Sequence, residues 1–187
     1  MRVIVGITGA SGAIYGIRVV EELAARGVET HLVVSRWGRE TIRLETDRDP
    51  ASVEALATSV YRHDDLSAPI SSGSFRADAM VIVPCSMKTA AAIAHGYSDD
   101  LISRAAAVRI KEKSTLVIVP RETPLSPVHL ENLLRLAQLG VVVLPPMPAF
   151  YNRPTSVQEL VDHTVGRVLD HLGIEHNLLK RWGVGGV

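Results

Sequence analysis

Short, mostly apolar runs alternate along the chain with longer stretches in which apolar residues recur every three or four positions. The short runs are residues 3–7, 29–35, 79–84, 115–120 and 141–145. β-Branched runs without polar alternation are typical of parallel strands that are covered on both faces. We therefore expect five buried strands.

The intervals between these runs have the apolar period of helices. The expected helices cover residues 13–27, 36–47, 52–61, 86–96, 101–113, 127–140 and 156–173. Strands that alternate with helices predict an α/β fold, here a doubly wound parallel sheet of the Rossmann- or flavodoxin-like class, with helices on both faces. No repeat or linker interrupts residues 1–187, so we expect a single α/β domain with a C-terminal tail from about residue 174.

Composition removes several classes of function. Lys plus Arg and Asp plus Glu number 20 each, so no global charge draws the protein to nucleic acid or to an anionic membrane. The single cysteine, Cys85, excludes an intrachain disulfide and argues against a cysteine-based zinc site. No apolar stretch approaches the ~20 residues of a membrane span. We expect a cytoplasmic protein with no nucleic-acid, membrane or metal partner.

Ligands of doubly wound folds bind where the strands end at their carboxyl edge. The five segments at that edge are residues 8–13, 35–38, 84–89, 120–123 and 145–154. Each of them carries polar, charged or conformationally special residues. This edge is therefore the expected site.

The first of these segments contains a glycine loop, in which Gly6, Gly9 and Gly12 form G-x-x-G-x-x-G. Its amides and the following helix N-terminus are suited to an anion such as a phosphate, and the alternative is a tight turn without a ligand. A nicotinamide cofactor is disfavoured because Ser35 and Arg36 stand where an acid would hold the ribose. No tyrosine has a lysine four residues later, so the catalytic pair of a short-chain dehydrogenase is missing as well.

Four further candidates have unremarkable interpretations when the residues are considered alone. Cys85 has no base nearby in sequence and is interpreted as a small packed side chain rather than a nucleophile. Glu45 near a helix end is interpreted as a solvated acid. The acidic runs at residues 63–65 and 98–100 lack the carboxylate spacing of a magnesium-diphosphate site and are interpreted as caps or loops.

Basic residues offer a second kind of site. Arg104 and Lys111 share one face of an expected helix. Arg121 and Glu122 directly follow a strand, where they form either a phosphate site or a rim ion pair. Tyr151 lies in a proline-rich loop that either encloses an apolar substrate or packs against another subunit.

Eight segments, in order along nearly the whole chain, together resemble one family. They are GITGASGAIYG, LETD, ISSGSF, PCSMKT, RETPL, HLENLLRL, PPMPAFYNRP and KRWG. They resemble the UbiX flavin prenyltransferases, and most closely the B subunit of non-oxidative hydroxyarylic acid decarboxylase systems.

The resemblance implies an activity and partners. Members of this family join a dimethylallyl group from dimethylallyl monophosphate to N5 and C6 of reduced FMN, without a metal. The prenylated FMN serves a UbiD-type aromatic acid decarboxylase, and the expected assembly is a homo-oligomer, a dodecamer. The alternative is a non-catalytic FMN-binding accessory subunit of a hydroxyarylic acid decarboxylase complex.

The resemblance also implies roles for individual residues, and it replaces the solvated interpretation of Glu45 with a catalytic acid. The implied catalytic residues are Ser11, Glu45, Glu122 and Tyr151. The implied FMN contacts are Gly9, Ala10, Ser11, Ser35, Ser86, Met87, Lys88, Thr89 and Arg121. The implied contacts with dimethylallyl monophosphate are Arg104, Lys111, Glu122, Tyr151, Arg167 and Trp182.

One position departs from the pattern of the family. The resemblance leads us to expect an aspartate at position 107, where this chain has Ala107. The missing acid removes a partner for a neighbouring base, so a subunit contact or the position of an arginine is expected to differ.

Overall fold

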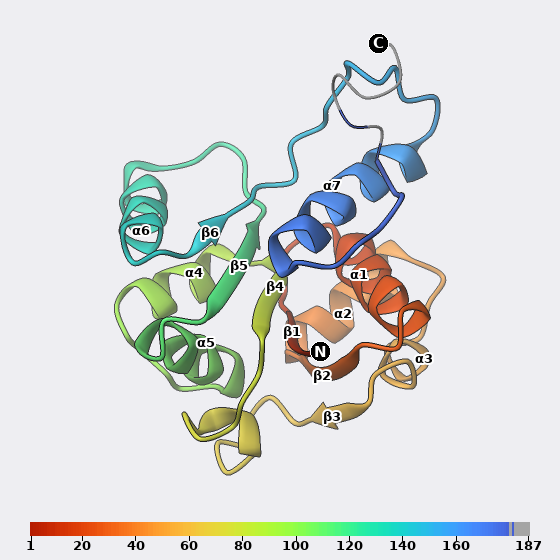
Figure 1. Ribbon diagram of the computed structural model, residues 1–187. Coiled ribbons are helices and arrows are strands. Elements are labelled where there is room, and N and C mark those ends of the chain that lie inside the picture. The colour runs from red at the N-terminus through yellow and green to blue at the C-terminus, as the bar shows by residue number, and fades with distance from the viewer. Residues whose placement is uncertain (180, 182–187) are drawn as a thin grey trace.

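The computed structural model describes residues 1–179 and 181, which form alternating strands and helices (Figure 1). The strands are β1 (Arg2–Ile7), β2 (Glu29–Val34), β3 (Ser59–Tyr61), β4 (Ala79–Cys85), β5 (Thr115–Pro120) and β6 (Val142–Val143). The helices are α1 (Ala13–Ala25), α2 (Arg36–Glu45), α3 (Pro50–Glu54), α4 (Met87–Ala94), α5 (Leu101–Lys111), α6 (Pro127–Gln138) and α7 (Val157–Leu172), with a 3₁₀ turn η1 (Pro69–Ser71).

All strand pairs in the described part of the chain are parallel, in the order β3-β2-β1-β4-β5-β6. The chain moves outward from β1 to β3 and then returns across β1 to β4. The order reverses between β1 and β4, and a crevice forms there at the carboxyl ends of the strands. The predicted doubly wound fold is confirmed.

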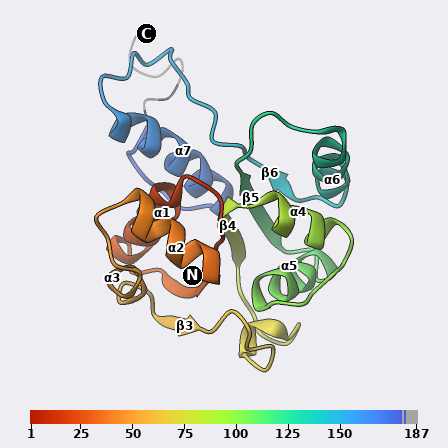
Figure 2. The same ribbon diagram turned by 180° about the vertical axis from the view of Figure 1, so that it is seen from behind.

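Helices cover both faces of the sheet (Figures 1 and 2). On one face, Val3, Val5 and Ile7 of β1 pack in a core with α1, α2, α3 and α7. On the other face, Ile4 of β1 packs in a core with α4, α5 and α6. Adjacent side chains of β1 thus enter different cores, which is why the run has no polar alternation.

The expected helix over 52–61 is wrong in its second half. Helix α3 ends at Glu54, and residues 59–61 form the edge strand β3, which pairs with β2. The apolar period continues past the end of the helix, but Val60 and Tyr61 are residue types that favour strands. Tyr61 is held there by its hydroxyl, 2.8 Å from Nδ1 of His31 on β2.

Two segments near the C-terminus lie against or beside α7. Residues 144–156 leave the sheet and extend past the N-terminal end of α7 (Figure 1). The chain turns at Gly173 and runs back along the helix, where His176 contacts Asp170 at 3.1 Å. None of the helices in the described part of the chain is long and apolar enough to cross a membrane.

Candidate active site

A cleft of about 360 Å³ lies at the carboxyl edge of the sheet. It is lined by Thr8, Gly9, Ser35, Arg36, Trp37, His63, Ser86, Lys88, Thr89, Asp100 and Ile102. These residues follow β1, β2, β3 and β4 or begin α5. Five of the predicted FMN contacts are among them, so the structure brings these five residues together.

Three helices begin at this cleft, and each is capped by a side chain from its lining. Ser35 accepts a hydrogen bond from the amide of Gly38 at 3.0 Å at the start of α2. Ser86 accepts one from the amide of Thr89 at 3.2 Å at the start of α4. Asp100 caps α5 and lies 3.4 Å from Nζ of Lys88. The positive ends of α2 and α4 and two cationic side chains, Lys88 and Arg36, favour an anion in the cleft, whereas the carboxylate of Asp100 already occupies the end of α5.

The end of β1 is tied to the start of α4 by a buried threonine. The hydroxyl of Thr8 donates to the carbonyl of Pro84 at 2.8 Å and accepts from the amide of Ser86 at 2.8 Å. Of the neighbouring predicted contacts, Ala10 and Met87 are buried. Cys85 is fully buried, and burial raises the pKa of its thiol to about 12, so its interpretation as a packed side chain is confirmed.

The N-terminus of α1 holds an anion that belongs to the protein itself. Oε2 of Glu45, at the end of α2, accepts hydrogen bonds from the amides of Gly12 at 2.7 Å and Ala13 at 3.0 Å. The prediction that the glycine loop and this helix end hold a ligand anion is therefore wrong for these two amides. The interpretation of Glu45 as a merely solvated acid is wrong too, because its carboxylate caps a helix.

Glu45 is ionised at neutral pH. Partial burial favours the neutral acid, but hydrogen bonds from the Ser11 hydroxyl and from the Ala13 and Gly12 amides, with the charge of Arg121, outweigh it. The pKa of Glu45 therefore lies below its usual value. The carboxylate can accept a proton or a hydrogen bond, and it fixes the position of the Ser11 hydroxyl.

Close packing explains why the loop and its neighbours contain glycines. A Cβ on Gly9 would lie 2.3 Å from Cβ of Trp37, and one on Gly38 would lie 2.6 Å from the carbonyl oxygen of Ile7. The start of α2 therefore rests directly on the end of β1. Gly12 has a φ of 101°, which a side chain rarely adopts.

Arg121 and Glu122 follow β5 and do different things. Nε of Arg121 donates to the carbonyl oxygen of Ser11 at 3.2 Å, so this guanidinium joins the glycine loop. The carboxylate of Glu122 is exposed and accepts from the amide of Thr123 at 2.9 Å. Arg121 thus completes a cluster with Ser11 and Glu45 beside the cleft.

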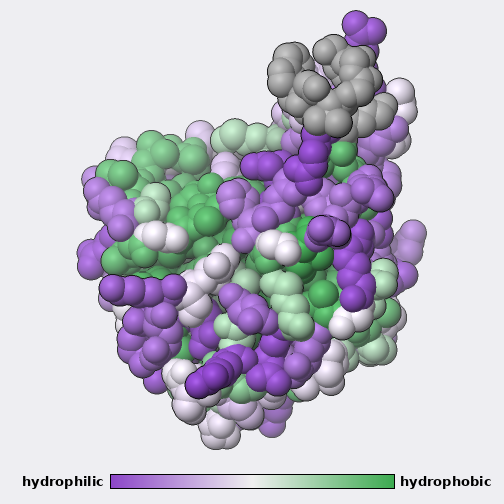
Figure 3. All heavy atoms as spheres, viewed as in Figure 1, coloured by the Kyte–Doolittle hydropathy of each residue, from purple (hydrophilic) through white to green (hydrophobic). Residues whose placement is uncertain are grey.

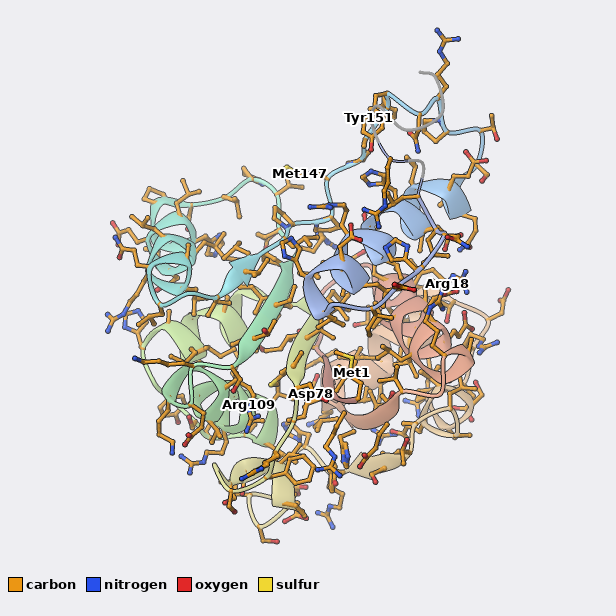
Figure 4. The ribbon with its side chains drawn as sticks, viewed as in Figure 1. Met1, Arg18, Asp78, Arg109, Met147 and Tyr151 are labelled. Atoms are coloured by element: carbon orange, nitrogen blue, oxygen red, sulfur yellow. The ribbon has the colours of Figure 1, made fainter. Side chains whose placement is uncertain are left out.

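A second pocket, of about 350 Å³, lies between the 144–156 segment, α7 and the C-terminal segment. It is lined by Tyr151, His163, Arg167, Leu179 and Arg181. The Tyr151 hydroxyl lies 3.3 Å from Nε2 of His163, and the rings meet edge to face. Burial and the charge of Arg167 lower the pKa of His163, so the imidazole is neutral at pH 7. Tyr151 lies high on the molecule, beside the end of α7 (Figure 4).

The basic residues of α5 lie at a third place. Nε of Arg104 donates to the carbonyl oxygen of Ser71 at 3.0 Å, and Nζ of Lys111 pairs with Glu112 at 2.5 Å. Lys111 is about 14 Å along the helix axis from Ile102, which lines the cleft. Arg109, two residues before Lys111 on α5, lies far from Tyr151 (Figure 4). One chain therefore does not bring α5 and α7 cations together.

Comparison with known proteins places this chain in a family. A family model described as Flavoprotein matches residues 1–169. The flavin prenyltransferase LpdB of Lactiplantibacillus plantarum is 56% identical over 182 residues, which cover 97% of each chain. The crystal structure of AnUbiX in complex with FMN and dimethylallyl pyrophosphate matches with a TM-score of 0.96 and 52% identity, over 97% of each chain. The chain belongs to the UbiX-like flavin prenyltransferases.

Another relative shows how flavin prenyltransferase-like chains assemble. The dodecameric FMN-dependent Ubix-like decarboxylase from Escherichia coli O157:H7 has a TM-score of 0.95 and 52% identity, over 97% of this chain and 99% of that one. The recognition of the UbiX family from short motifs is thus confirmed over almost the whole chain.

The family assignment leaves two features of this chain to be placed. Trp182 lies outside the residues that the structure describes. Position 107 is three residues after Arg104 and four before Lys111, so an acid there would reach either. In this chain Arg104 donates to the carbonyl oxygen of Ser71 and Lys111 pairs with Glu112, so both cations have partners without an acid at position 107. Within residues 1–179 and 181, no group of three or more His, Cys, Asp or Glu side chains is arranged to hold a metal ion.

Several lining residues escaped the sequence analysis. Trp37 lies two residues after Ser35, in a segment that is expected at the edge, so its position is a usable signal. The apolar period predicts a helix over residues 52–61, and for that reason the loop that contains His63 is not expected at this edge. Asp100 and Thr8 look like ordinary cap and turn residues in the sequence.

Proposed function

We propose that this protein transfers a dimethylallyl group to reduced FMN and releases prenylated FMN. The observation that carries the proposal is the cleft at the switch point, where Ser35, Ser86, Thr89 and Lys88 meet the N-termini of α2 and α4. This set favours a phosphate ester with a polar chain, as FMN has. Relatives that are more than 50% identical over nearly the whole chain support the transferase activity.

The residues beside the cleft suit the reacting part of the flavin. Ser11 and Arg121 lie together, and Glu45 orients the hydroxyl of Ser11. We assign Ser11 to the reactive flavin edge and Glu45 to proton transfer during ring closure. Because Glu45 rests as a carboxylate, its first task is to accept a proton, which it can return later.

The chemistry forms two carbon bonds to the flavin, one at N5 and one at C6. The C–O bond of the prenyl phosphate breaks, and the allyl carbon bonds to N5, whose proton passes to Glu45. Glu45 then returns this proton to the double bond of the attached prenyl group, the resulting tertiary carbon bonds to C6 to close the new ring, and C6 loses its proton to the departed phosphate or to Glu122. Arg and Lys side chains stabilise the leaving phosphate, which removes the need for a magnesium ion. Tyr151 supplies a π surface for allyl cation character.

We propose that the prenyl phosphate is bound between copies of the chain. Arg167 and Tyr151 form one pocket on α7, whereas Arg104 and Lys111 lie on α5, which packs on the opposite face of the sheet. A dodecameric relative supports an assembly in which one copy completes the site of another. We assign Trp182 to the same site from the family pattern alone.

The finer identities also belong to this proposal. The donor is dimethylallyl monophosphate, although the AnUbiX crystal contained the pyrophosphate, because the family pattern implies a single phosphate. The product is consumed by a UbiD-type decarboxylase. The cytoplasmic location expected from the sequence is also part of this proposal.

The deciding experiment is anaerobic. Pure protein is mixed with reduced FMN and either dimethylallyl monophosphate or the pyrophosphate, without metal or partner, and the released flavin is weighed by mass spectrometry. A gain of one five-carbon unit with the monophosphate confirms the transferase. An unchanged flavin that still copurifies with the protein favours the accessory subunit instead, and unchanged flavin that does not bind rejects both.

A further inference from the structure

The cleft contains an aromatic side chain that has no role in the proposed chemistry. Trp37 lines the cleft and exposes 67% of its surface. Most of the other lining side chains are hydroxylic or charged, and Ile102 is the other large apolar one. A solvent-exposed tryptophan at the rim of a polar cleft leaves a large apolar face to water, which costs free energy unless a ligand covers it.

The backbone of Trp37 is fixed in place. Trp37 occupies the first turn of α2, which Ser35 caps. Its Cβ lies against Gly9, and this contact leaves no room for a side chain at position 9. Gly38 holds the same turn against the carbonyl oxygen of Ile7. The ring therefore projects from a rigid platform beside the glycine loop, and little ordering entropy is lost when a ligand packs on it.

We propose that Trp37 forms the apolar wall of the flavin site and packs against the isoalloxazine ring of bound FMN. This inference rests on the proposed FMN binding. The ring system of a flavin is broad and flat, and the lining otherwise offers it mainly polar groups. Trp37 thus contributes affinity for the ring, whereas the helix N-termini and Lys88 contribute affinity for the phosphate.

Aromatic side chains stack on nucleic-acid bases, and a flavin presents a comparable π face. Replacement of Trp37 by Ala should therefore raise the Kd for FMN on the order of tenfold. Trp37→Phe keeps a smaller ring and should bind within about threefold of the wild type. Riboflavin, which lacks the phosphate, should lose affinity by a similar factor in Trp37→Ala.

The test is a fluorescence titration of oxidised FMN, with every variant in a Trp182→Phe background so that Trp37 is the remaining tryptophan. A tryptophan in contact with a flavin quenches its emission, so saturated Trp37→Phe should be brighter than its parent. Tyr97→Ala is the matched control, because Tyr97 is 62% exposed and lies outside the cleft lining. Thermal unfolding checks that each variant is folded.

The outcomes separate this inference from the function on which it rests. Failure of the parent protein to bind FMN removes the proposed function. Binding with equal Kd and equal flavin brightness in the parent, Trp37→Ala and Trp37→Phe overturns the role of Trp37 and leaves the function intact. Equal Kd together with a smaller assembly in Trp37→Ala overturns it as well, and makes Trp37 a contact between copies.

Discussion

Glu45 shows how one side chain can serve both the fold and the site. Its carboxylate occupies the amides of Gly12 and Ala13, where a ligand phosphate was expected, and it holds the hydroxyl of Ser11. An anion in the cleft beside it is thereby left to the N-termini of α2 and α4. The sequence analysis could place Glu45 near a helix end, but a cap that joins residues 33 positions apart depends on tertiary structure.

Glu45→Gln should keep FMN affinity nearly unchanged and lose most of the turnover. The side-chain amide oxygen of the variant still accepts a hydrogen bond from the start of α1. The amide carries no negative charge, however, and it cannot accept a proton in the reaction. We expect the free energy of unfolding to fall by about 1 kcal/mol, as for other weakened caps. Turnover, flavin titration and thermal unfolding measure these three effects.

The control is Glu40→Gln on the same helix, where Glu40 pairs with Arg43 at the surface. It should change neither FMN binding nor turnover. Loss of FMN binding in Glu45→Gln would make Glu45 a structural residue rather than a catalytic one.

At the scale of elements, the buried strands could be predicted because each enters two cores and is apolar on both faces. Edge strand β3 could not be predicted, because a strand of three residues is too short to show a hydrophobic period. The strand ends located most of the cleft, since parallel strands bring their carboxyl ends together. The prenyl phosphate contacts on α5 and α7 could be assigned only from the resemblance to the family. Helix periodicity indicates which face of a helix is polar, but it does not indicate which copy of the chain that face contacts in an assembly.

Asp170 should tie the C-terminal segment to α7 in a pH-dependent way. Burial favours its neutral form, but hydrogen bonds and charges from Arg181 and His176 outweigh burial and lower its pKa to about 2. This stabilisation is complete above pH ~4, near the pKa of the unfolded chain, and is lost as the pH falls toward 2. Asp170→Asn should therefore cost about 1–2 kcal/mol at pH 7, reduced by solvent screening of the half-exposed arginine.

Chemical denaturation at several pH values measures this effect. The difference between wild type and Asp170→Asn should shrink steadily between pH 4 and pH 2. Asp47→Asn, at an exposed position, serves as the control. A difference that stays constant over this range would show that Asp170 acts through its shape and not through its charge.

Arg167→Ala should weaken the binding of dimethylallyl monophosphate about 10- to 100-fold and leave FMN affinity nearly unchanged, since a charge-assisted hydrogen bond is lost. Arg167 also pairs with Asp170 at 2.8 Å. Arg43→Ala, which removes an exposed guanidinium that pairs with Glu40 on α2 in the same i,i+3 geometry, is the control. Calorimetric titration with each ligand separates the two affinities. Equal losses for both ligands in Arg167→Ala would contradict its assignment to the prenyl phosphate.

The whole molecule presents surfaces that a single copy leaves uncovered. Hydrophobic residues gather over α6 (Figure 3). There Val128, Leu130 and Leu134 expose 53–62% of their surface, and Met147 exposes 69%. Apolar side chains grouped in this way are typical of interfaces between subunits. Together with the dodecameric relative, they support an assembly of copies as the working form.

An assembly that shares its sites should allow two inactive variants to rescue each other. Lys111→Ala removes a cation from α5 and Arg167→Ala removes one from α7, and each should reduce turnover on its own. When the two chains are coexpressed and assemble at random, about a quarter of the sites combine an intact α5 from one copy with an intact α7 from another. Turnover should then return to about a quarter of the wild-type value, as expected if the sites act independently.

If coexpression of the two variants restores no turnover, the result argues against a site shared between copies. If both cations that bind one prenyl phosphate came from the same copy, every site in a mixed assembly would lack one of them, and coexpression would restore nothing. Mixed assemblies, verified by affinity tags of two kinds, exclude the trivial case in which the variants do not assemble. FMN bound per chain should stay the same in all assemblies, because the cleft lies within one copy.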